Sequence, residues 1–288
     1  MMEARALLLR GDVDGLDRLL HREPELVHGR VRSSDPPYDG YFNGATLLHH
    51  VAGNPLLAPL RREMPEVARL LLALDADVDA STRPGPSQPD DIGWTTLGLV
   101  ASSAEARRAS LQIELMDVLL DAGADPDARE GGCIMGALFY GETRAAEHLA
   151  RHGARLDVIA AAGVGDLHRL ETLLGRADLG PRLVHYSPVP WPSDGGRAEI
   201  LATALGYAAL HGRTEGLLCL LAAGADPNHQ APVNGRALHW AVLGDRPDSV
   251  RVLLDAGADP GVRDMDHGAT PAEWAAHLGH ASAGAALA

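Results

Sequence analysis

One eight-residue phrase, Leu-Leu-x-Ala-Gly-Ala-Asp-Pro, recurs along this chain of 288 residues. Close copies stand at 119–126, 220–227 and 253–260, and weaker copies stand at 71–78 and 149–156. Neighbouring copies are about one repeat apart, because Gly123 and Gly153 are separated by 30 residues and Gly224 and Gly257 by 33. Self-similarity at a period of about 20 to 50 residues is the sequence signature of stacked-repeat architectures. The chain is therefore predicted to form a solenoid, in which each repeat packs on its neighbours.

Each repeat is predicted to contain two short helices. Within 236–258, apolar residues recur at helical spacing in two stretches, Leu238, Ala241 and Val242, then Val250, Leu253 and Leu254. Gly244 and Asp245 interrupt the pattern between the two stretches. Gly257 is suited to a left-handed C-terminal cap, and Pro260 cannot continue the helix. Two short helices with one apolar stripe each cannot bury those stripes alone, so they are expected to stack on neighbouring pairs.

Three segments share the pieces of one further motif, 46–51 (Thr-Leu-Leu-His-His-Val), 238–241 (Leu-His-Trp-Ala) and 270–271 (Thr-Pro). Together with the repeat length, they make the chain resemble the ankyrin-repeat family over nearly its whole length. The resemblance implies an all-α ankyrin-repeat solenoid with a concave face made by first helices and projecting loops. It also implies that His49 and His239, at the signature position, form structural hydrogen bonds within the stack. Other units depart from the signature by placing Gly98, Met135 and Gly206 there.

Alignment on the Leu-Leu pair of the second helix predicts about eight helix-turn-helix units. They cover 4–28, 44–80, 94–128, 131–157, 158–185, 201–229, 235–263 and 268–288. Gly11-Asp12 and Leu26-Val27-His28 in the first unit are matched by Gly165-Asp166 and Leu183-Val184-His185 in the fifth. The chain is thus predicted to be two related arrays fused without a linker, 1–157 with long inserted loops and 158–288 with a C-terminal cap.

Interruptions of the repeat are the candidate binding segments. Two of them, 29–43 and 186–200, are rich in proline and aromatic residues and follow Leu-Val-His in each array. The others are 55–62, 81–93 and 104–110. Long loops on a rigid scaffold are where binding usually resides. The alternative is drift in surface loops that tolerate change.

The aromatic residues divide into two groups. Tyr207, Trp240 and Trp274 share one aligned slot, 33 and 34 residues apart, which predicts a stack inside the core. The others fall in loops or at the ends of first helices, where aromatic side chains favour partner binding. The predicted binding residues are Tyr38, Tyr41, Phe42, Trp94, Phe139, Tyr140, Tyr186 and Trp191, together with His211, which aligns with an exposed slot of the concave face. The alternative for some of these aromatic residues is that they anchor the loops.

Charge and composition argue against several partners and compartments. The chain has 25 basic residues, all of them arginine, against 39 acidic ones, so its net charge is −14. It has no basic run that could neutralise phosphates, so neither nucleic acid nor an anionic membrane is an expected partner. No stretch approaches the roughly 18 apolar residues of a membrane span. The 2 cysteines and the absence of a signal-peptide pattern favour the cytoplasm.

The sequence offers no motif for metal binding or catalysis. Asp75, Asp77 and Asp79 alternate, but they lie in a repeat turn, where aspartate bends the chain. Cys-x-x-Cys, His-Glu-x-x-His, nucleophile-elbow and phosphate-loop patterns do not occur. We therefore expect no metal, no cofactor and no catalytic residue.

The leading functional hypothesis is a non-catalytic scaffold that binds a protein, polar or basic, through its concave face and long loops. The rival is a small-molecule-binding protein or an enzyme. In it, loops 29–43 and 186–200 close a pocket over the concave groove, and the candidate groups are Asp39, Tyr41, His49, His50 and His211. A third alternative is self-association through an exposed end of the stack. An enclosed cavity with converging polar groups would favour the rival, whereas an open aromatic groove would favour the scaffold.

Overall fold

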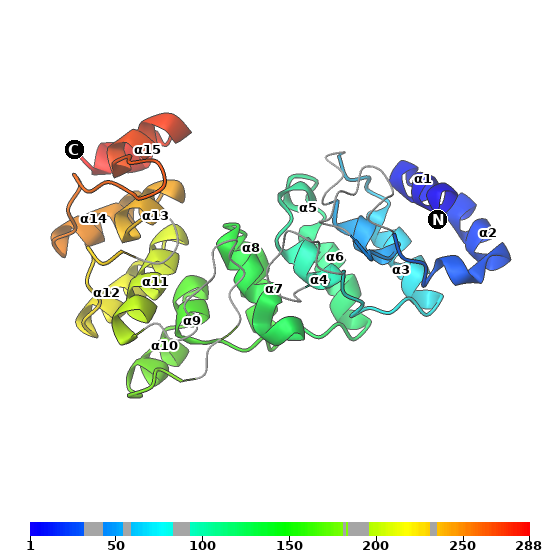
Figure 1. Ribbon diagram of the computed structural model, residues 1–288, viewed down its shortest axis with the longest axis horizontal. Helices are drawn as coiled ribbons and strands as arrows, with labels where there is room; N and C mark the ends of the chain where they lie inside the picture. The colour runs from blue at the N-terminus through cyan, green and yellow to red at the C-terminus, as the bar shows by residue number, and fades with distance from the viewer. Residues whose placement is uncertain (32–42, 54–58, 83–92, 181–182, 184–195, 231–234) are drawn as a thin grey trace. The chain divides into compact units, whose positions relative to one another are not determined.

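The computed structural model describes residues 1–31, 43–53, 59–82, 93–180, 183, 196–230 and 235–288 (Figure 1). The chain divides into two compact units, which we call the N-terminal unit (1–154) and the C-terminal unit (155–288). Apart from one isolated bridge between Ser81 and Thr95, the described part of the chain has no β-pairing. Among the same residues, no helix combines the length and the apolar character that crossing a bilayer requires.

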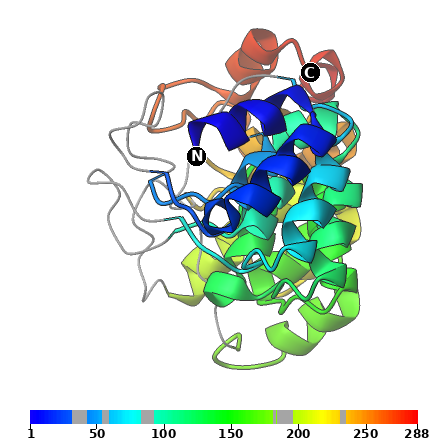
Figure 2. The same cartoon turned by 90° about the vertical axis from the view of Figure 1, so that its right-hand side faces the viewer.

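The N-terminal unit is built from two rows of helices. Its helices are α1 (Met2–Arg10), α2 (Val13–Arg22), η1 (Pro24–Leu26), η2 (Leu48–Ala52), α3 (Met64–Ala73), α4 (Thr96–Ala101), α5 (Ala104–Arg108), α6 (Gln112–Asp121), α7 (Ala128–Phe139) and α8 (Thr143–Arg151). The first helices η2, α4 and α7 pack on one another in chain order, and the second helices α2, α3, α6 and α8 do the same. Figure 2 shows the opening pair, α1 and α2, side by side in dark blue. The insertion predicted at 104–110 folds into the short helix α5.

The C-terminal unit repeats this arrangement. Its helices are α9 (Val158–Val164), α10 (Leu167–Leu174), α11 (Arg197–Leu210), α12 (Thr214–Ala222), α13 (Ala237–Leu243), α14 (Pro247–Asp255), α15 (Pro271–Leu278) and α16 (Ala281–Ala286). The first helices α9, α11, α13 and α15 form one row, and the second helices α10, α12, α14 and α16 form the other. The described residues of the two units thus confirm the predicted succession of helix pairs. One departure is η2, which is a short 3₁₀ helix where the pattern predicts an α-helix.

The opening pairs of the two units have the same local structure. Gly11 ends α1 and Gly165 ends α9, both with left-handed backbone (φ 72° and 82°). Asp12 then caps α2 by accepting a hydrogen bond from the Gly15 N–H (2.9 Å), and Asp166 caps α10 in the same way. These caps satisfy N–H groups that the first turn of a helix leaves free.

The repeated phrase ends each second helix. Gly123, Gly224 and Gly257 have φ of 89°, 90° and 87°, a left-handed conformation that costs glycine little and other residues more. The amide of the following alanine turns back onto the helix, as in the 3.0 Å bond from the Ala124 N–H to the Leu119 carbonyl. The left-handed cap predicted for Gly257 is therefore confirmed, and so is its equivalent in the other close copies.

Side chains in the turns link each repeat to the next. Asp79 accepts a hydrogen bond from the Asp125 N–H (3.0 Å), one repeat further along the chain. Asn228, in the equivalent slot, accepts from the Asp259 N–H (2.8 Å) and donates to the Gly257 carbonyl (2.9 Å). Burial raises the pKa of Asp79, although its bond from Asp125 opposes the shift.

Two arginines link the helices in a second way. Arg213 and Arg246 stand at the N-caps of α12 and α14. The Arg213 Nε donates to the Gly163 carbonyl (3.1 Å) near the end of α9, and the Arg246 Nε donates to the Leu210 carbonyl (3.1 Å), the last residue of α11. Each guanidinium therefore satisfies a carbonyl that the end of a helix leaves without an intrahelical partner.

The signature histidines are structural. His49 accepts a hydrogen bond at Nδ1 from the Thr46 N–H (3.1 Å) and donates from Nε2 to the Trp94 carbonyl (3.1 Å). His239 accepts from the Arg236 N–H (3.4 Å) and donates to the Ala269 carbonyl (3.1 Å) of the following repeat. The hydrogen bonds that the resemblance implied are therefore present.

Of the three aromatic residues that share one aligned slot of the repeat, two form a stack in the core. Tyr207 and Trp240 are buried, with ring centroids 5.3 Å apart. Trp274 is only half-buried and lies against the ring of His239, also at 5.3 Å. The predicted stack is thus present at Tyr207 and Trp240, but Trp274 has a more exposed role because it belongs to the last repeat.

Candidate functional site

Several of the predicted binding residues lie outside the described residues. They are Tyr38, Tyr41, Phe42, Tyr186 and Trp191. The same is true of Asp39 and of most of the loops 29–43 and 186–200. Binding by these residues, and a pocket closed by the two loops, stay predictions.

Trp94 is not an exposed binding residue, and this prediction is wrong. The side chain is 6% exposed, because glycines of two helices leave room for its ring. A β-carbon added at Gly98 in α4 would lie 3.2 Å from the ring, and one added at Gly136 in α7 would lie 3.0 Å from it. The backbone is held as well, since the Trp94 N–H donates to the Thr82 Oγ1 (2.8 Å). Trp94 is therefore a core residue that joins two repeats.

His211 is also buried, which contradicts the exposed position that its alignment predicted. It is 4% exposed, and its ring lies parallel to that of Tyr207 at 6.4 Å. The reason is the close approach of the next repeat, because a β-carbon added at Gly244 would lie 2.2 Å from the Leu210 carbonyl oxygen. Little of the His211 side chain is left to contact a partner.

Phe139 and Tyr140 stand at the end of α7, where the sequence placed them. Tyr140 is 47% exposed and Phe139 is half-buried. Their rings meet edge to face at 5.1 Å, an arrangement that aromatic pairs prefer. Gly141, with φ of 74°, turns the chain directly afterwards. The fold therefore presents Tyr140 at the surface and supports it with Phe139.

Leu278 of the C-terminal unit occupies the same place as Tyr140, and Leu243 corresponds to Phe139, one residue earlier in the repeat. Leu243 is the last residue of α13 and Leu278 is the last residue of α15, and a glycine follows each of them. They are 40% and 38% exposed, unusually high for leucine. Neither leucine is among the predicted binding residues, because those are all aromatic side chains or histidine. The signal that could have found Leu278 is its position immediately before the left-handed glycine that follows a first helix, which is the position of Tyr140. Leu243 stands one residue earlier in its repeat, at the last residue of α13.

An open groove runs between these two leucines. It has a volume of about 420 Å³ and is lined by Leu243, His267, Ala269, Glu273, Trp274, His277 and Leu278. We call it the terminal groove. Its apolar lining consists of the two leucines, the half-buried tryptophan and the alanine, and its polar lining consists of the two histidines and the glutamate. This composition suits a peptide or protein surface that has both apolar and hydrogen-bonding groups.

A single carboxylate positions the tryptophan of the terminal groove. The Trp274 Nε1 donates to Asp264 Oδ2 (3.0 Å), and the same side chain accepts from the N–H groups of His267 (2.7 Å) and Ala269 (2.9 Å). Burial alone would raise the pKa of Asp264, but these hydrogen bonds lower it to about 2. The carboxylate is therefore ionised at neutral pH and holds one wall of the groove in place.

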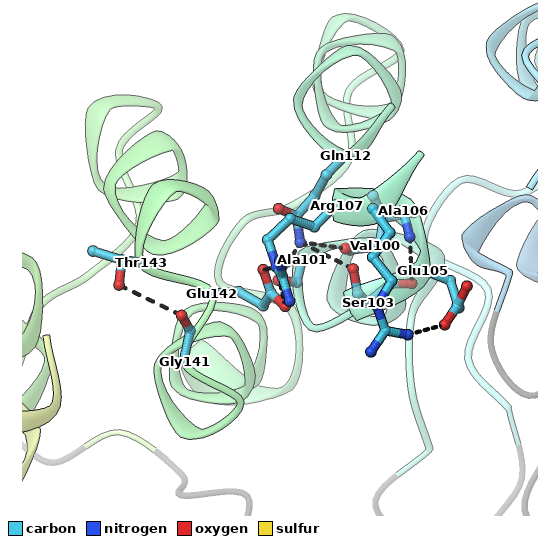
Figure 3. A network of polar contacts seen from close by, with 11 residues as sticks. Val100, Ala101, Ser103, Glu105, Ala106, Arg107, Gln112, Gly141, Glu142 and Thr143 are labelled. Carbon is cyan, nitrogen blue, oxygen red and sulfur yellow. Dashed lines mark hydrogen bonds and ion pairs between the residues drawn. The ribbon is translucent and has the colours of Figure 1, made fainter. Parts of the chain in front are cut away.

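A second, more polar groove lies beside α8 in the N-terminal unit. It has a volume of about 370 Å³, and Gln112, Gly141 and Thr143 are among its lining residues. Figure 3 shows that Arg107 from α5 reaches Glu142, which is buried, with Nε 2.9 Å from Oε2. The Gln112 amide donates to the carbonyl of Ala101 (3.1 Å), at the end of α4. These bonds are internal to the fold, so they explain how the inserted helix α5 is attached rather than how a ligand binds.

The described histidines named for the enzyme hypothesis are not available for catalysis. His49 and His50 are at most 1% exposed, and burial lowers the pKa of each to about 4. His211 is buried as described above. Burial also raises the pKa of the Cys133 thiol to about 12, so it is protonated at neutral pH. A general acid or base must reach its substrate, so these groups are excluded from that role.

Comparison with known proteins gives two kinds of likeness. A family model described as ankyrin repeats (three copies) matches residues 134–264 and 205–288, together more than half of the chain. Among solved structures, the human ASB11 ankyrin repeat domain shares 20% identity, covers 99% of this chain and 95% of its own, and superposes with a TM-score of 0.46. The ankyrin repeat domain of Bcl-3, an IkappaB protein family member, shares 20% identity over 94% of this chain and 92% of its own, with a TM-score of 0.42. No curated protein matches the chain by sequence.

Proposed function

The chain belongs to the ankyrin-repeat family, whose domains generally mediate protein–protein interaction, and we propose that it binds a protein partner through the exposed ends of its first helices. The principal contact surface in this proposal is the terminal groove. Tyr140 is proposed as a further contact on the N-terminal unit.

The observation that carries the proposal is the pair of half-exposed leucines beside Trp274. Large apolar side chains gain free energy when a partner removes them from water, about 1.5–3 kcal/mol for the complete burial of one leucine. Leu243 and Leu278 are each about two-fifths exposed, so each would contribute roughly 1 kcal/mol on this scale. Trp274 adds an aromatic side chain of the kind that dominates binding energy at protein interfaces.

The terminal groove is ordered before any partner arrives. Thr270 and Glu273 form a reciprocal cap at the start of α15, in which the Glu273 Oε2 accepts from the Thr270 N–H at 2.7 Å. Asp264 fixes the Trp274 ring from the other side. A surface that is already ordered loses little conformational entropy on binding, which favours affinity.

The charge of the chain suggests the chemistry of the partner. A net charge of −14 favours a basic or polar protein, whose rate of association should fall as salt rises. The loop aromatic residues Tyr38, Tyr41, Phe42, Tyr186 and Trp191 remain part of the proposal as additional contacts. They lie outside the described residues, so the decisive test uses the terminal groove.

The test compares three forms of the full chain in affinity capture from the source cells. They are the wild type, the double variant Leu243→Glu with Leu278→Glu, and the control Leu218→Glu. Leu218 is 57% exposed on the second helix α12, so its substitution makes the same leucine-to-glutamate change outside the groove, with one added carboxylate against two in the double variant. We expect the double variant to lose one or more proteins that the wild type and the control retain, with affinity weakened at least about tenfold for the purified partner.

The result that would overturn the proposal is equal retention of every captured protein by all three forms. Circular dichroism of each variant must show the helical content of the wild type. Leu243 and Leu278 are about three-fifths buried, so each replacement is expected to cost roughly 1–2 kcal/mol of stability.

A further inference from the structure

Three side chains of metal-binding type gather on the second helices of the N-terminal unit. Asp117 comes from α6, His148 comes from α8, and His152 is the residue that ends α8. One ligand atom of each lies within 4.8 Å of the others, and they are the one such group of three or more among the described residues. His148 and His152 are four residues apart, so they lie on the same face of the helix.

The three side chains differ in how firmly they are held. His148 is buried, and its Nε2 lies 2.7 Å from Asp117 Oδ1. Asp117 is about half-exposed, and His152 is exposed with its ring centroid 4.3 Å from that of His148. One ligand is therefore fixed by packing, while two can adjust by side-chain rotation.

The hydrogen bond of His152 leaves one of its two ring nitrogens available to a metal. Its Nδ1 lies 2.9 Å from the His148 carbonyl oxygen, which can only accept, so Nδ1 carries the proton. The lone pair is then on Nε2. Metal-binding histidines commonly donate their other ring N–H to a carbonyl or carboxylate in this way, because the bond fixes the tautomer and the ring orientation.

We propose that Asp117, His148 and His152 form a binding site for one zinc ion, with water completing the coordination. Two imidazole nitrogens and one carboxylate oxygen are ligands that zinc prefers, whereas calcium and magnesium prefer oxygen alone. Zinc lies about 2.0–2.2 Å from such ligands, so two of them are at most about 4 Å apart. The separation of up to 4.8 Å therefore closes with movements of about 1 Å, which rotation of the half-exposed Asp117 side chain and the exposed His152 side chain can supply.

Arg151 is the neighbouring group that opposes the metal. Its Nη2 lies 3.4 Å from His148 Nδ1, so it places a positive charge beside the site. The variant Arg151→Gln should therefore bind zinc more tightly than the wild type. This change in affinity is opposite to the change caused by losing a ligand, which makes it a useful second measurement.

Zinc bound here would link two consecutive repeats, because α6 and α8 pack on each other as second helices. A ligand that binds only the folded chain raises its stability in proportion to the logarithm of the ligand concentration. The expected effect is a melting temperature that rises with zinc in the wild type and stays constant in variants without the site.

The experiment is calorimetric titration of the full chain with zinc chloride. The variants are His152→Ala and Asp117→Asn, and the control is His21→Ala. His21 is exposed and lies 3.1 Å from Asp17 in another four-residue pair, so its loss controls for weak binding to surface histidines. We expect one zinc ion per wild-type chain and affinity at least about tenfold weaker in both site variants, with no change in the control.

Two results would overturn the site. One is wild-type binding no tighter than that of His152→Ala and Asp117→Asn. The other is an equal loss of affinity in His21→Ala, which would show that the zinc is shared among surface histidines. Titration with Co²⁺, whose visible absorption reports its ligands, distinguishes a defined site from scattered contacts.

Discussion

Two glycines of first helices face tryptophan rings at different distances, and this difference yields a quantitative prediction. A β-carbon at Gly206 would meet three ring atoms of Trp240 at 3.6 Å, which is ordinary contact. A β-carbon at Gly136 would lie 3.0 and 3.1 Å from Cζ3 and Cη2 of Trp94. The Trp94 ring has little room to move away, because it also packs closely on Gly98, where an added β-carbon would lie 3.2 Å from the ring.

The magnitudes follow from two opposing effects. Alanine is favoured over glycine inside a helix by up to about 1 kcal/mol. At position 206 nothing opposes this gain, so Gly206→Ala should stabilise the chain by about 1 kcal/mol. At position 136 overpacking costs about 1–3 kcal/mol, so Gly136→Ala should destabilise the chain by about 1 kcal/mol net. The two variants should therefore differ by about 2 kcal/mol, although the substitution is the same.

Urea unfolding followed by circular dichroism measures the difference. For a slope near 2 kcal/mol per molar urea, the two midpoints should lie about 1 M apart. In the Trp94→Phe background the shorter ring leaves room for the methyl group, so the penalty of Gly136→Ala should fall below about 0.5 kcal/mol. Equal midpoints for Gly136→Ala and Gly206→Ala, or an unchanged penalty in the Trp94→Phe background, would refute the packing argument.

Two further predictions concern buried ionisable groups. Burial lowers the pKa of His49 and His50 from 6.5, the value in the unfolded chain, to about 4 in the folded chain. Between pH 6.5 and pH 4 the unfolded chain therefore binds more protons than the folded chain does. Acidification through this window should remove roughly 3 kcal/mol of stability per ring, and a urea midpoint that stayed constant between pH 7.5 and pH 5 would contradict it. Arg107→Ala should destabilise the chain by about 1–2 kcal/mol, because the buried Glu142 side chain, 2% exposed, loses its ion-pair partner. The loss is limited because the Arg107 side chain is half-exposed, so water already screens the ion pair. Arg108→Ala, which breaks an exposed ion pair, is the control and should change thermal stability by less than about 0.5 kcal/mol.

The features that could be predicted from the sequence are those encoded within one repeat. The turn glycine, the Leu-Leu pair and the helix spacing are local, because each acts on residues within about one helical turn. They were sufficient for the helix pairs and for the caps at Gly123, Gly224 and Gly257. The short η2 was not predicted, since the choice between a 3₁₀ and an α-helix depends on a few hydrogen bonds at its ends.

The features that could not be predicted depend on contacts between repeats. Trp94 was placed at the surface, yet its burial requires Gly136, which lies in the following repeat. His211 was also placed there, and the next repeat covers it. Leu278 occupies the equivalent slot and is exposed because α15 is the last first helix. The four-residue spacing of His148 and His152 is visible in the sequence. Asp117, the third residue of the proposed zinc site, comes from α6 in the preceding repeat, so a motif within one repeat cannot reveal it.

The arginines at the N-caps of α12 and α14 have a consequence for the proposed binding of a protein. Arg213 and Arg246 already donate hydrogen bonds to backbone carbonyls at the ends of α9 and α11. These carbonyls therefore have less capacity to accept a further hydrogen bond from a bound protein. Recognition at the ends of the first helices then depends mainly on side chains, such as Leu243 at the end of α13. A substitution at such a side chain changes the surface that a bound chain meets, while the two arginine–carbonyl hydrogen bonds that hold the neighbouring helices remain in place.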